Sequence, residues 1–438
     1  MKRLSLGLKL LGGYVKSNQK SFLVGFILSL TAIIYLPKIL SYLNLRPIAT
    51  VGVVGNFTLS TLPREIQDQL SFGLVKLNPD GTVAPAVAST WQATDSGKTY
   101  VFKLNQSYRW SDGVKLDSSQ INYNLRGVDI SKPDGSTVKF SLREPFAPLL
   151  PLLSQPLFKN GLVGLGENQV TDVKFAGRFV SQLRLQNIKT KELLIYKFYP
   201  SEAELMTALK LGSIKKASGL HDLSGFRFPK TFQVSNKIDG YSQAVVFFNT
   251  QKPFFDDKAF RQALVYSLPN DFAEGQAADS PIPQNSWVGS LMTKKYSQNI
   301  VLAKNTLEKV ASGSALPRII LSTSRKLRHT ADEVALAWQN LGLNVIVETT
   351  DTRPINFDAF LTLVQLPVDP DQYALWHSTQ TGNIAGYKSF KVNKLLEEGR
   401  QEIDKEKRQA IYQNFQKAIT EDVPAAFLFY PKVYTISR

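Results

Sequence analysis

The chain has 438 residues, of which 43% are hydrophobic and 20% charged, and its formal net charge is +16. This is more apolar material than one ordinary domain needs, so we expect at least two hydrophobic cores. Cysteine is absent, which excludes disulfides, thiolate metal sites, cysteine nucleophiles and a lipid-modified cysteine anchor.

The positive charge is not arranged as in nucleic-acid-binding proteins. The first 46 residues contain no acidic residue and carry Lys2, Arg3, Lys9, Lys16, Lys20, Lys38 and Arg46. Elsewhere the basic residues are scattered singly or in pairs, without the interleaved arginines and aromatics that stack on bases. We therefore predict no nucleic-acid partner, and we attribute the basic surface to anionic lipid or cell-wall polymer.

An apolar segment follows the basic N-terminus. Phe22 to Leu36 carries no charge, and the apolar pattern resumes after Lys38 up to Leu45. If Lys38 extends its ammonium to the interface, residues 21–45 are long enough to form one transmembrane signal anchor. More basic residues precede this segment than follow it, which predicts a cytoplasmic segment at 1–20 and an extracytoplasmic domain beyond about residue 46. We expect a single-pass protein of the cell membrane.

A cleaved signal peptide is the alternative reading of the same segment, because the uncharged run is also compatible with a signal-peptide core. Cleavage requires small residues at a defined spacing. The residues from Leu36 to Leu40 and from Arg46 to Thr50 offer no such pattern. The sequence thus favours an uncleaved anchor.

From Val51 onward there is no repeat or low-complexity tract, which predicts one compact, multi-lobed body. Thr99 to Leu104 alternates in the manner of a strand and follows a turn at 95–98. Ala203 to Leu211 has the spacing of a helix, with Gly212 as its stop signal. Ala244 to Phe248 is typical of a short buried strand.

The clearest local unit runs from Arg318 to Thr349. An apolar strand precedes Thr330, which we predict as a helix N-cap with Glu333 three residues later, and a second strand begins at Asn344. Such a strand–helix–strand crossover implies a parallel pair of strands covered by a helix. A strand over 357–366 and two helices over 392–420 would complete an α/β lobe.

The motifs of known enzymes and metal sites are missing. The histidines His221, His329 and His377 are far apart and show no His-x-x-x-His spacing, so we predict no metal site. There is no phosphate-binding loop and no nucleophile elbow. Asp369 and Asp371 flank a proline, which favours a structural turn over a catalytic pair. We therefore expect no catalytic residue, no cofactor and no enzymatic activity.

Three groups of motifs carry a resemblance to a known family. The first spans Leu70–Val75, Asp80-Gly81, Trp91, Thr94–Leu104 and Trp110–Gly113; the second spans Phe247–Thr250, Pro253–Asp257 and Arg261–Leu264; the third spans Asp369–Tyr373, Trp376–Ser378, Gly386-Tyr387, Ile411 to Pro424 and Phe427–Tyr430. In this order they resemble the solute-binding proteins of peptide, nickel and oligosaccharide ABC importers, extracytoplasmic solute-binding protein family 5.

The resemblance implies an α/β, two-lobed periplasmic-binding-protein-like fold of the large peptide-binding type, with a subdomain inserted in lobe one, following the N-terminal transmembrane helix. On this basis lobe one spans 48–248 and 428–438, and lobe two spans 249–427. The chain would cross between the lobes near Phe247 to Gln251 and near Phe427 to Lys432. The ligand would be held between the lobes, which close by a hinge motion.

The implied function is that of a membrane-anchored substrate-binding protein. It would bind a peptide or other small extended solute as a monomer and deliver it to the permease subunits of an ABC importer. Two alternatives remain. One is an anchored receptor or scaffold of the same fold that no longer serves transport. The other is a secreted hydrolase, which the missing nucleophile elbow, metal motif and triad disfavour.

The resemblance also indicates ligand contacts. Aligned on Asp369-Pro370, the family acid that pairs with a peptide amino terminus falls on Leu366, and its preceding aromatic falls on Leu363. Neither residue can pair with an ammonium, so we expect recognition without a free amine, through backbone groups and apolar pockets. The predicted ligand-binding residues are Asn56, Phe57, Thr58, Leu59, Leu363, Val364, Gln365, Leu366 and Phe429. The alternative is that Leu363, Val364 and Leu366 pack in the core of lobe two.

Overall fold

The computed structural model describes residues 25, 29–31, 35, 48–223, 226–227, 229–289, 293–350 and 352–438. The chain divides into two units, Met1–Ala49 and Thr50–Arg438. The predicted cytoplasmic segment 1–20 lies outside the described residues, as does nearly all of the predicted transmembrane segment 21–45. Within the described ranges, no helix is both long enough and apolar enough to span a bilayer.

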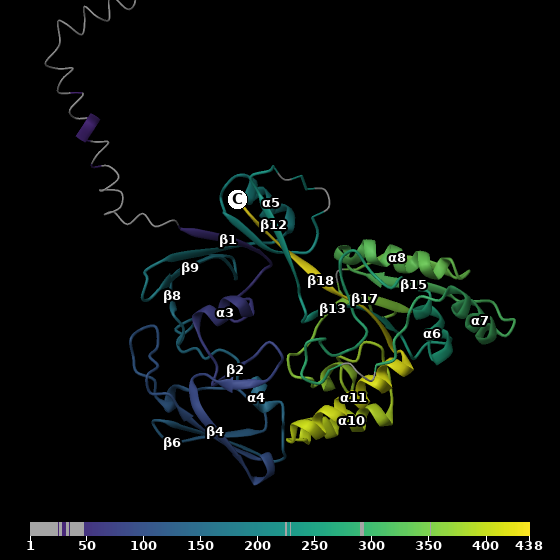
Figure 1. Cartoon of the computed structure of the whole chain (residues 1–438), viewed down its shortest axis with the longest axis horizontal. Coiled ribbons are helices and arrows are strands. Elements are labelled where there is room, and N and C mark those ends of the chain that lie inside the picture. Colours follow the sequence, from purple (N-terminus) through teal and green to yellow (C-terminus); the bar gives the residue numbers. More distant parts are fainter. Residues whose placement is uncertain are drawn as a thin grey trace, which may run out of the picture. The chain divides into compact units, whose positions relative to one another are not determined.

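One large mixed sheet organises the second unit (Figure 1). Its strand order is β16 (Asn344–Thr349), β15 (Arg318–Thr323), β17 (Ala359–Gln365), β13 (Ser242–Phe248), β18 (Ala425–Ser437), β11 (Lys216–Leu220), β1 (Ala49–Val54), β10 (Leu193–Tyr199), β9 (Phe179–Asn187) and β8 (Asn168–Ala176). Two further strands, β12 (Gln233–Ile238) and β14 (Gly275–Ala277), pair with β18.

The long strand β18 joins the two halves of this sheet. Its first half, from Ala425 to Phe429, pairs with β13, whereas its second half, from Lys432 onward, pairs with β12 and β11. We define lobe two as residues 242–431. Lobe one comprises 50–69, 166–238 and 432–438, with residues 70–165 as its inserted subdomain.

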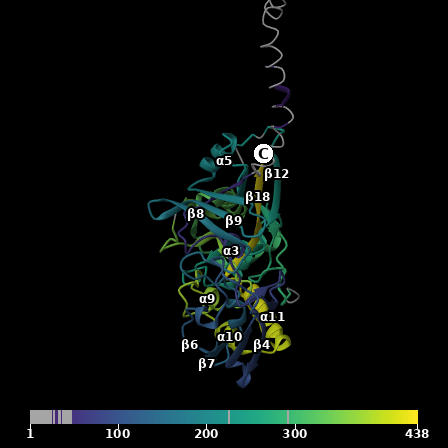
Figure 2. The ribbon, with the colours of Figure 1, turned by 90° about the vertical axis from the view of Figure 1, so that its left-hand side faces the viewer.

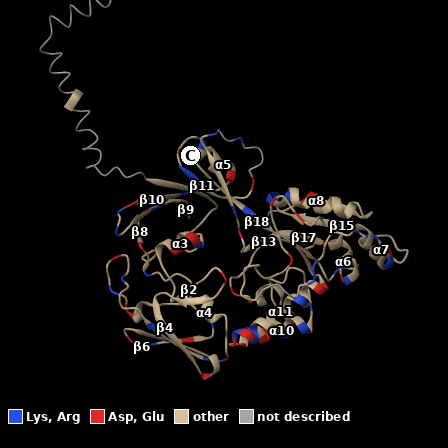
Figure 3. Ribbon diagram, viewed as in Figure 1, with Lys and Arg blue, Asp and Glu red and all other residues tan. Residues whose placement is uncertain are grey.

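Lobe two packs a core on each face of the sheet. Successive side chains of β13 point to opposite faces, so Val246 joins one core and Phe247 the other. The first core is covered by α6 (Lys258–Tyr266), α7 (Ile300–Ala311) and α8 (Arg328–Gln339). The second is covered by α9 (Tyr373–Trp376), α10 (Phe390–Gln401) and α11 (Lys405–Asp422). Both α8 and α10 carry charges of both signs (Figure 3).

Lobe one carries α3 (Arg64–Leu70) and α5 (Glu202–Lys210) against its part of the sheet. The hydroxyl of Ser201 caps α5 by accepting a hydrogen bond from the backbone of Glu204. A glycine at position 52 of β1 makes room for this helix, because a Cβ there would lie 2.2 Å from the side chain of Leu205. The helix can therefore pack closely on the strand.

The inserted subdomain has its own core. It contains a two-stranded sheet, β2 (Val75–Leu77) and β3 (Val83–Pro85), and a four-stranded sheet in the order β4 (Ala88–Thr94), β5 (Thr99–Leu104), β7 (Thr137–Leu142), β6 (Val128–Asp134), with the short helix α4 (Leu149–Leu152). Trp110, Phe102 and Phe140 are buried between them. Figures 1 and 2 both show β4 and β6, the two edge strands of the larger sheet, away from β18.

Most of the predicted elements are present, but two details differ. The crossover β15–α8–β16 forms, with its strands parallel. The predicted N-cap at Thr330 is wrong: α8 begins at Arg328, directly after a 3₁₀ turn at Arg325–Leu327. The buried side chain of Leu327 fixes that turn in the core, so the helix starts earlier than the local polar signal indicates.

The boundaries between the lobes also differ from the predicted ones. Those fell between residues 248 and 249 and between residues 427 and 428. The strand β13 pairs with β17 along its whole length and packs in the cores of lobe two. In β18 the change of partner comes at Pro431 and Lys432. The crossing therefore occurs at residues 239–241 and near 431, because pairing of β13 with β17 keeps it in lobe two.

Candidate functional site

The loop after β1 contains the predicted ligand residues of lobe one. Gly55 has a φ of +135°, and a Cβ at this position would lie 2.5 Å from the ring of Phe57, so only glycine fits. The carbonyl of Phe57 accepts a hydrogen bond from Val180 N at 2.8 Å, and its ring meets that of Phe198 edge-on. Asn56 is exposed, whereas Phe57, Thr58 and Leu59 are half-buried. The loop is thus bonded to β9 and packed on β10, with Asn56 at its surface.

The end of β17 contains the predicted residues of lobe two. Its strand pairs with β13 up to Gln365, but with β15 only from Ala359 to Leu361. Beyond Leu361, among the described residues, no strand pairs with the side of β17 that faces away from β13. The strand therefore ends with one unpaired edge.

The direction of the backbone groups on this edge follows from strand alternation. Leu366 N donates to Tyr241 O of the crossing segment at 2.6 Å, so the backbone groups of residues 364 and 366 face β13. Those of Leu363 and Gln365 face the other way, toward the unpaired edge. These two residues present the donors and acceptors that an added strand needs.

The side chains from Leu363 to Leu366 differ in burial. Leu363 is half-buried against the first core of lobe two, and Val364 and Leu366 are buried in the second. Gln365 is exposed, and its amide donates to Tyr241 O at 3.0 Å. The alternative that Val364 and Leu366 pack in the core therefore describes their side chains, while the neighbouring backbone stays open at the edge.

Phe429 lies in β18, where its side chain is 1% exposed and packs on Phe272 in the first core of lobe two. It does not line open space in this structure. The reason is local: the backbone of β18 is flanked by β13 and β14 at this position, so both sides of the strand are covered. The prediction of a ligand pocket at Phe429 has no support from this placement.

The carboxylates that follow β17 are paired with arginines. Asp369 accepts two hydrogen bonds from Arg408, at 2.6 and 2.8 Å, with both side chains buried. Asp371 accepts from Arg400 Nε at 2.9 Å. Burial raises the pKa of Asp371, and Arg400 counteracts this. Both acids thus serve structure, and neither is free to pair with a ligand amine.

A turn of the inserted subdomain contacts lobe two close to the end of β17. The carbonyl of Asp80 accepts from Trp287 N at 3.0 Å, and that of Pro79 accepts from the Tyr241 hydroxyl at 3.1 Å. Gly81 has a φ of +86°, and a Cβ there would lie 3.0 Å from Val368 O. The turn at 78–81 therefore depends on glycine for its fit against lobe two.

A second contact lies further along the subdomain. Ala147 N donates to Arg400 O at 2.8 Å. The guanidinium of Arg400 also lies over the rings of Phe146 and Tyr373, at 5.2 and 4.1 Å. The sequence analysis included Asp80-Gly81 among the family motifs. It missed Tyr241, Trp287 and Arg400, whose partners are too distant along the chain to leave a local pattern.

Comparison with known proteins identifies the class. Residues 189–386 match the family model described as Bacterial extracellular solute-binding proteins, family 5 Middle. The chain is 22% identical to the oligopeptide-binding protein AppA of Bacillus subtilis, over 87% of this chain and 86% of that protein. It is 23% identical to the probable D,D-dipeptide-binding periplasmic protein DdpA of Escherichia coli, over 81% and 82%.

Solved structures share the fold. NikZ from Campylobacter jejuni in complex with Ni(L-His) superposes with a TM-score of 0.74 at 19% identity, covering 89% of this chain and 94% of that one. AppA from Bacillus subtilis in complex with a nonapeptide gives 0.69 at 18% identity, covering 90% and 95%.

The fold and these matches define a mixed α/β protein with the two-lobed fold of periplasmic binding proteins. Within this class the chain is similar to solute-binding protein family 5, and the resemblance carried by its motifs is confirmed. These relatives are named as binding proteins rather than as enzymes.

Proposed function

We propose that this chain is the extracytoplasmic substrate-binding component of an ABC importer, which binds a peptide or similarly extended solute between its lobes and delivers it to a permease. The relatives named for oligopeptide and dipeptide binding, and the nonapeptide complex of a protein with the same fold, support this assignment. Binding of this kind requires no covalent chemistry.

The unpaired edge of β17 carries the proposal. An extended peptide can add to such an edge as a further strand, with its main chain bonded to the backbone of Leu363 and Gln365. Because main-chain bonding does not depend on side chains, this mode tolerates varied peptide sequences. The half-buried residues of the loop Gly55–Leu59 would contribute apolar contacts from lobe one.

The acidic residues that follow β17 are not available to a peptide amino terminus. Position 366 is a leucine, and Asp369 and Asp371 are already paired with Arg408 and Arg400. A buried ammonium without a carboxylate partner would suffer a desolvation cost of several kcal/mol. We therefore propose that recognition does not depend on a free amine, so a bound peptide and its N-acetylated form should have similar affinities.

The test is a calorimetric titration of the full chain with a peptide that it binds. The affinity of the variant Q365P is compared with that of Q365A. Both variants lose the side-chain amide, but only Q365P also loses the N–H that faces the unpaired edge. We expect Q365P to bind the peptide at least about tenfold more weakly than Q365A. The peptide would lose one backbone hydrogen bond, and the proline ring would keep it from approaching the edge closely. Equal affinities would rule out pairing with this edge.

Repeating the titration with the N-acetylated peptide tests whether the free amine contributes to affinity. A loss of about two orders of magnitude on acetylation, roughly 2.8 kcal/mol, would show that some other acid anchors the amine. That outcome would leave the class of ligand unchanged while overturning the proposed mode of recognition.

We also propose that residues 21–45 hold the protein in the cell membrane, with residues 1–20 in the cytoplasm. The uncharged run from Phe22 to Leu36 and the excess of basic residues before it support this. In this arrangement the lobes lie outside the cell, where a binding protein meets its solute.

A further inference from the structure

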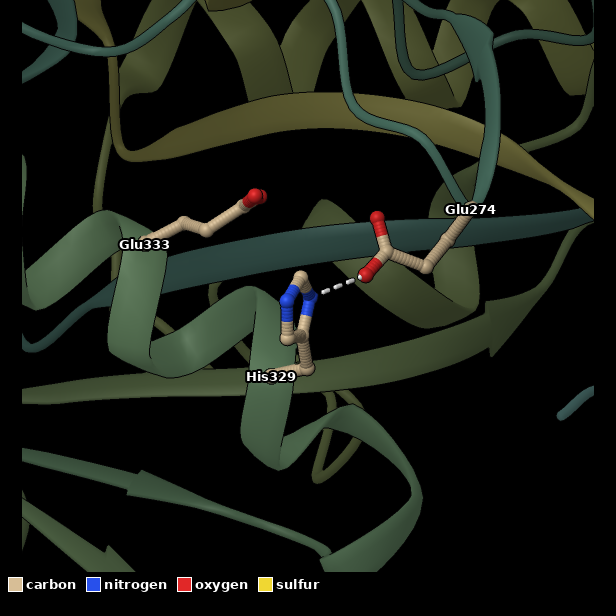
Figure 4. A group of neighbouring side chains, drawn as sticks. All are labelled: Glu274, His329 and Glu333. Carbon is tan, nitrogen blue, oxygen red and sulfur yellow. Dashed lines mark hydrogen bonds and ion pairs between the residues drawn. The ribbon is translucent and has the colours of Figure 1, made fainter. Parts of the chain in front are cut away.

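Three potential metal ligands from separate parts of lobe two lie together (Figure 4). His329 and Glu333 are four residues apart in the first turns of α8, so their side chains lie on one face of the helix. Glu274 comes from the loop that precedes β14. Figure 4 shows the carboxylates of Glu274 and Glu333 approaching the ring of His329 from different sides.

The distances are close to those of a coordination shell. His329 Nδ1 lies 2.6 Å from Glu274 Oε1, and one ligand atom from each of the three residues lies within 4.8 Å of the other two. Ligand atoms around a tetrahedral zinc ion are roughly 3.3 Å apart, given bonds of about 2.0–2.2 Å. Small side-chain rotations would therefore bring all three atoms to bonding distance.

The carboxylates lack a balancing cation. The second oxygen of Glu274 and that of Glu333 are both inaccessible to solvent and have no hydrogen-bond partner in the described part of the chain. Glu274 forms an ion pair only with His329 among the described residues, and no lysine or arginine is bridged to either acid there. Burying carboxylate oxygens without partners is unfavourable, so the cluster is one positive charge short.

The electrostatics of the cluster agree with the geometry. Burial raises the pKa of Glu333, and the nearby Glu274 raises it further. The hydrogen bond to Glu274 raises the pKa of His329. Burial and the close approach of the two carboxylates and the imidazole account for both shifts, in agreement with the distances given above.

We propose that Glu274, His329 and Glu333 bind a divalent transition-metal ion such as Zn²⁺, through one carboxylate oxygen from each glutamate and Nδ1 of the histidine. A ligand set with one imidazole nitrogen and two carboxylate oxygens suits zinc and its neighbours, whereas calcium and magnesium prefer oxygen alone. The side chain of His329 is 73% exposed, so the ion can enter from solvent and complete its shell with water.

The site would link α8 to the crossing strand. Glu274 O accepts a hydrogen bond from Lys432 N at 2.8 Å, and Lys432 Nζ donates to Ala273 O at 2.8 Å. Lys432 lies where β18 passes into lobe one. A metal ion bonded to Glu274 and to α8 would thus fasten the helix to the loop beside the crossing, independently of the β17 edge.

The experiment uses the full chain without a histidine tag, freed of metal by a chelator and titrated calorimetrically with Zn²⁺ and, separately, with Mg²⁺. We expect binding of Zn²⁺ with an accompanying rise in melting temperature, and no comparable effect of Mg²⁺. The variants E333Q and H329N should each weaken Zn²⁺ binding at least about tenfold, worth roughly 1.4 kcal/mol. Co²⁺ in place of Zn²⁺ should give a visible absorption band that these variants lose.

The matched control is E397Q. Glu397 also contacts a histidine, with 3.0 Å between its carboxylate and His377 Nε2, but has no second acid in the cluster. This variant should bind Zn²⁺ as the parent chain does, and circular dichroism shows whether each variant is folded. No binding by the parent chain up to about 100 μM Zn²⁺, or equal affinity of the parent, E333Q and H329N, would overturn the proposal.

Discussion

The buried pair of Asp369 and Arg408 stabilises the junction between β17 and α11. The two side chains are 8% and 7% exposed, and Arg408 also donates to Gly399 O. Burial by itself would lower the pKa of Arg408, but the carboxylate of Asp369 raises it above its usual value. The arginine therefore remains charged and neutralises an acid that could not be buried alone.

Removing the arginine tests this pair. R408M leaves the carboxylate of Asp369 buried without a partner, and we expect it to lower the free energy of unfolding by about 3–5 kcal/mol. The control is K394A, which removes a pair with Glu398 whose side chains are 62% and 47% exposed, at a cost below about 0.5 kcal/mol. Urea denaturation measures both, and equal losses would contradict a structural role for the buried pair.

His221, at the end of β11, provides a prediction about pH. Burial lowers the pKa of His221, and Lys326 lowers it further, while Glu202 and Asp239 act in the opposite direction. Its Nδ1 is buried without a hydrogen-bond partner. Folding therefore favours the neutral ring.

The sign follows from this lowered pKa. A histidine with a lower pKa in the folded state contributes stability above its unfolded value of about 6.5, and this contribution is lost as the pH falls through the folded value. We expect the free energy of unfolding to fall between about pH 7 and pH 5, and less steeply for H221Q. Denaturation curves at several pH values measure the slope, and identical slopes for both proteins would exclude His221 as its source.

At the scale of elements, the turn at 78–81 joins the inserted subdomain to lobe two. Gly81 and Gly113 have nearly the same φ, +86° and +87°. Only Gly81 is in close contact: a Cβ added there would lie 3.0 Å from Val368 O, whereas one added at Gly113 would meet nothing within 4 Å. The two glycines thus separate the effect of backbone conformation from that of the contact.

G81A and G113A should both lose about 1–2 kcal/mol of stability, because alanine is strained at positive φ. We expect G81A to lose at least about 1 kcal/mol more, since the turn must also move away from Val368 and Trp287. Chemical denaturation measures the difference. If G113A is as destabilised as G81A, the contact with lobe two does not contribute to stability.

Local patterns predict elements well and their partners poorly. The strands at 99–104 and 244–248 and the crossover at 318–349 were evident because hydrophobic periodicity is a local property. The start of α8 was not evident from the sequence, because it is determined by the burial of Leu327 in the core. The partners of Asp369 and of Glu274 lie 39 and 55 residues away, and no spacing rule connects residues so far apart.

At the scale of the whole molecule, the similarity to solute-binding protein family 5 was predictable from the order of the motifs, whereas the exact crossing between the lobes was not. The predicted crossing near Phe427 to Lys432 includes the change of partner in β18, whereas pairing with β17 assigns β13, and with it Phe247, to lobe two. Ligand contacts through backbone groups near Leu366 were predicted from the resemblance alone, and not as an open edge of β17. Its direction became clear only from the pairing with β13 and β15.

The proposed membrane topology gives a prediction for intact cells. Protease added to spheroplasts should degrade the large domain, because the proposed topology puts residues beyond about 46 outside the cell. A cytoplasmic protein of the same cells serves as the control for lysis. N-terminal sequencing of the membrane-bound protein should begin at or near Met1. Complete protection of the large domain, or a mature N-terminus near residue 50, would contradict an uncleaved anchor.

The position of β18 affects the order in which the protein can fold. This strand lies between β13 and β11 in the sheet, and it completes the hydrogen bonding of both lobes with residues 425–437. During synthesis, neither lobe can close its sheet until residues 425–437 have left the ribosome. The preceding strands must therefore wait with unpaired edges, which are prone to aggregation. Closure of the two lobes is thereby coupled, because both depend on the same strand.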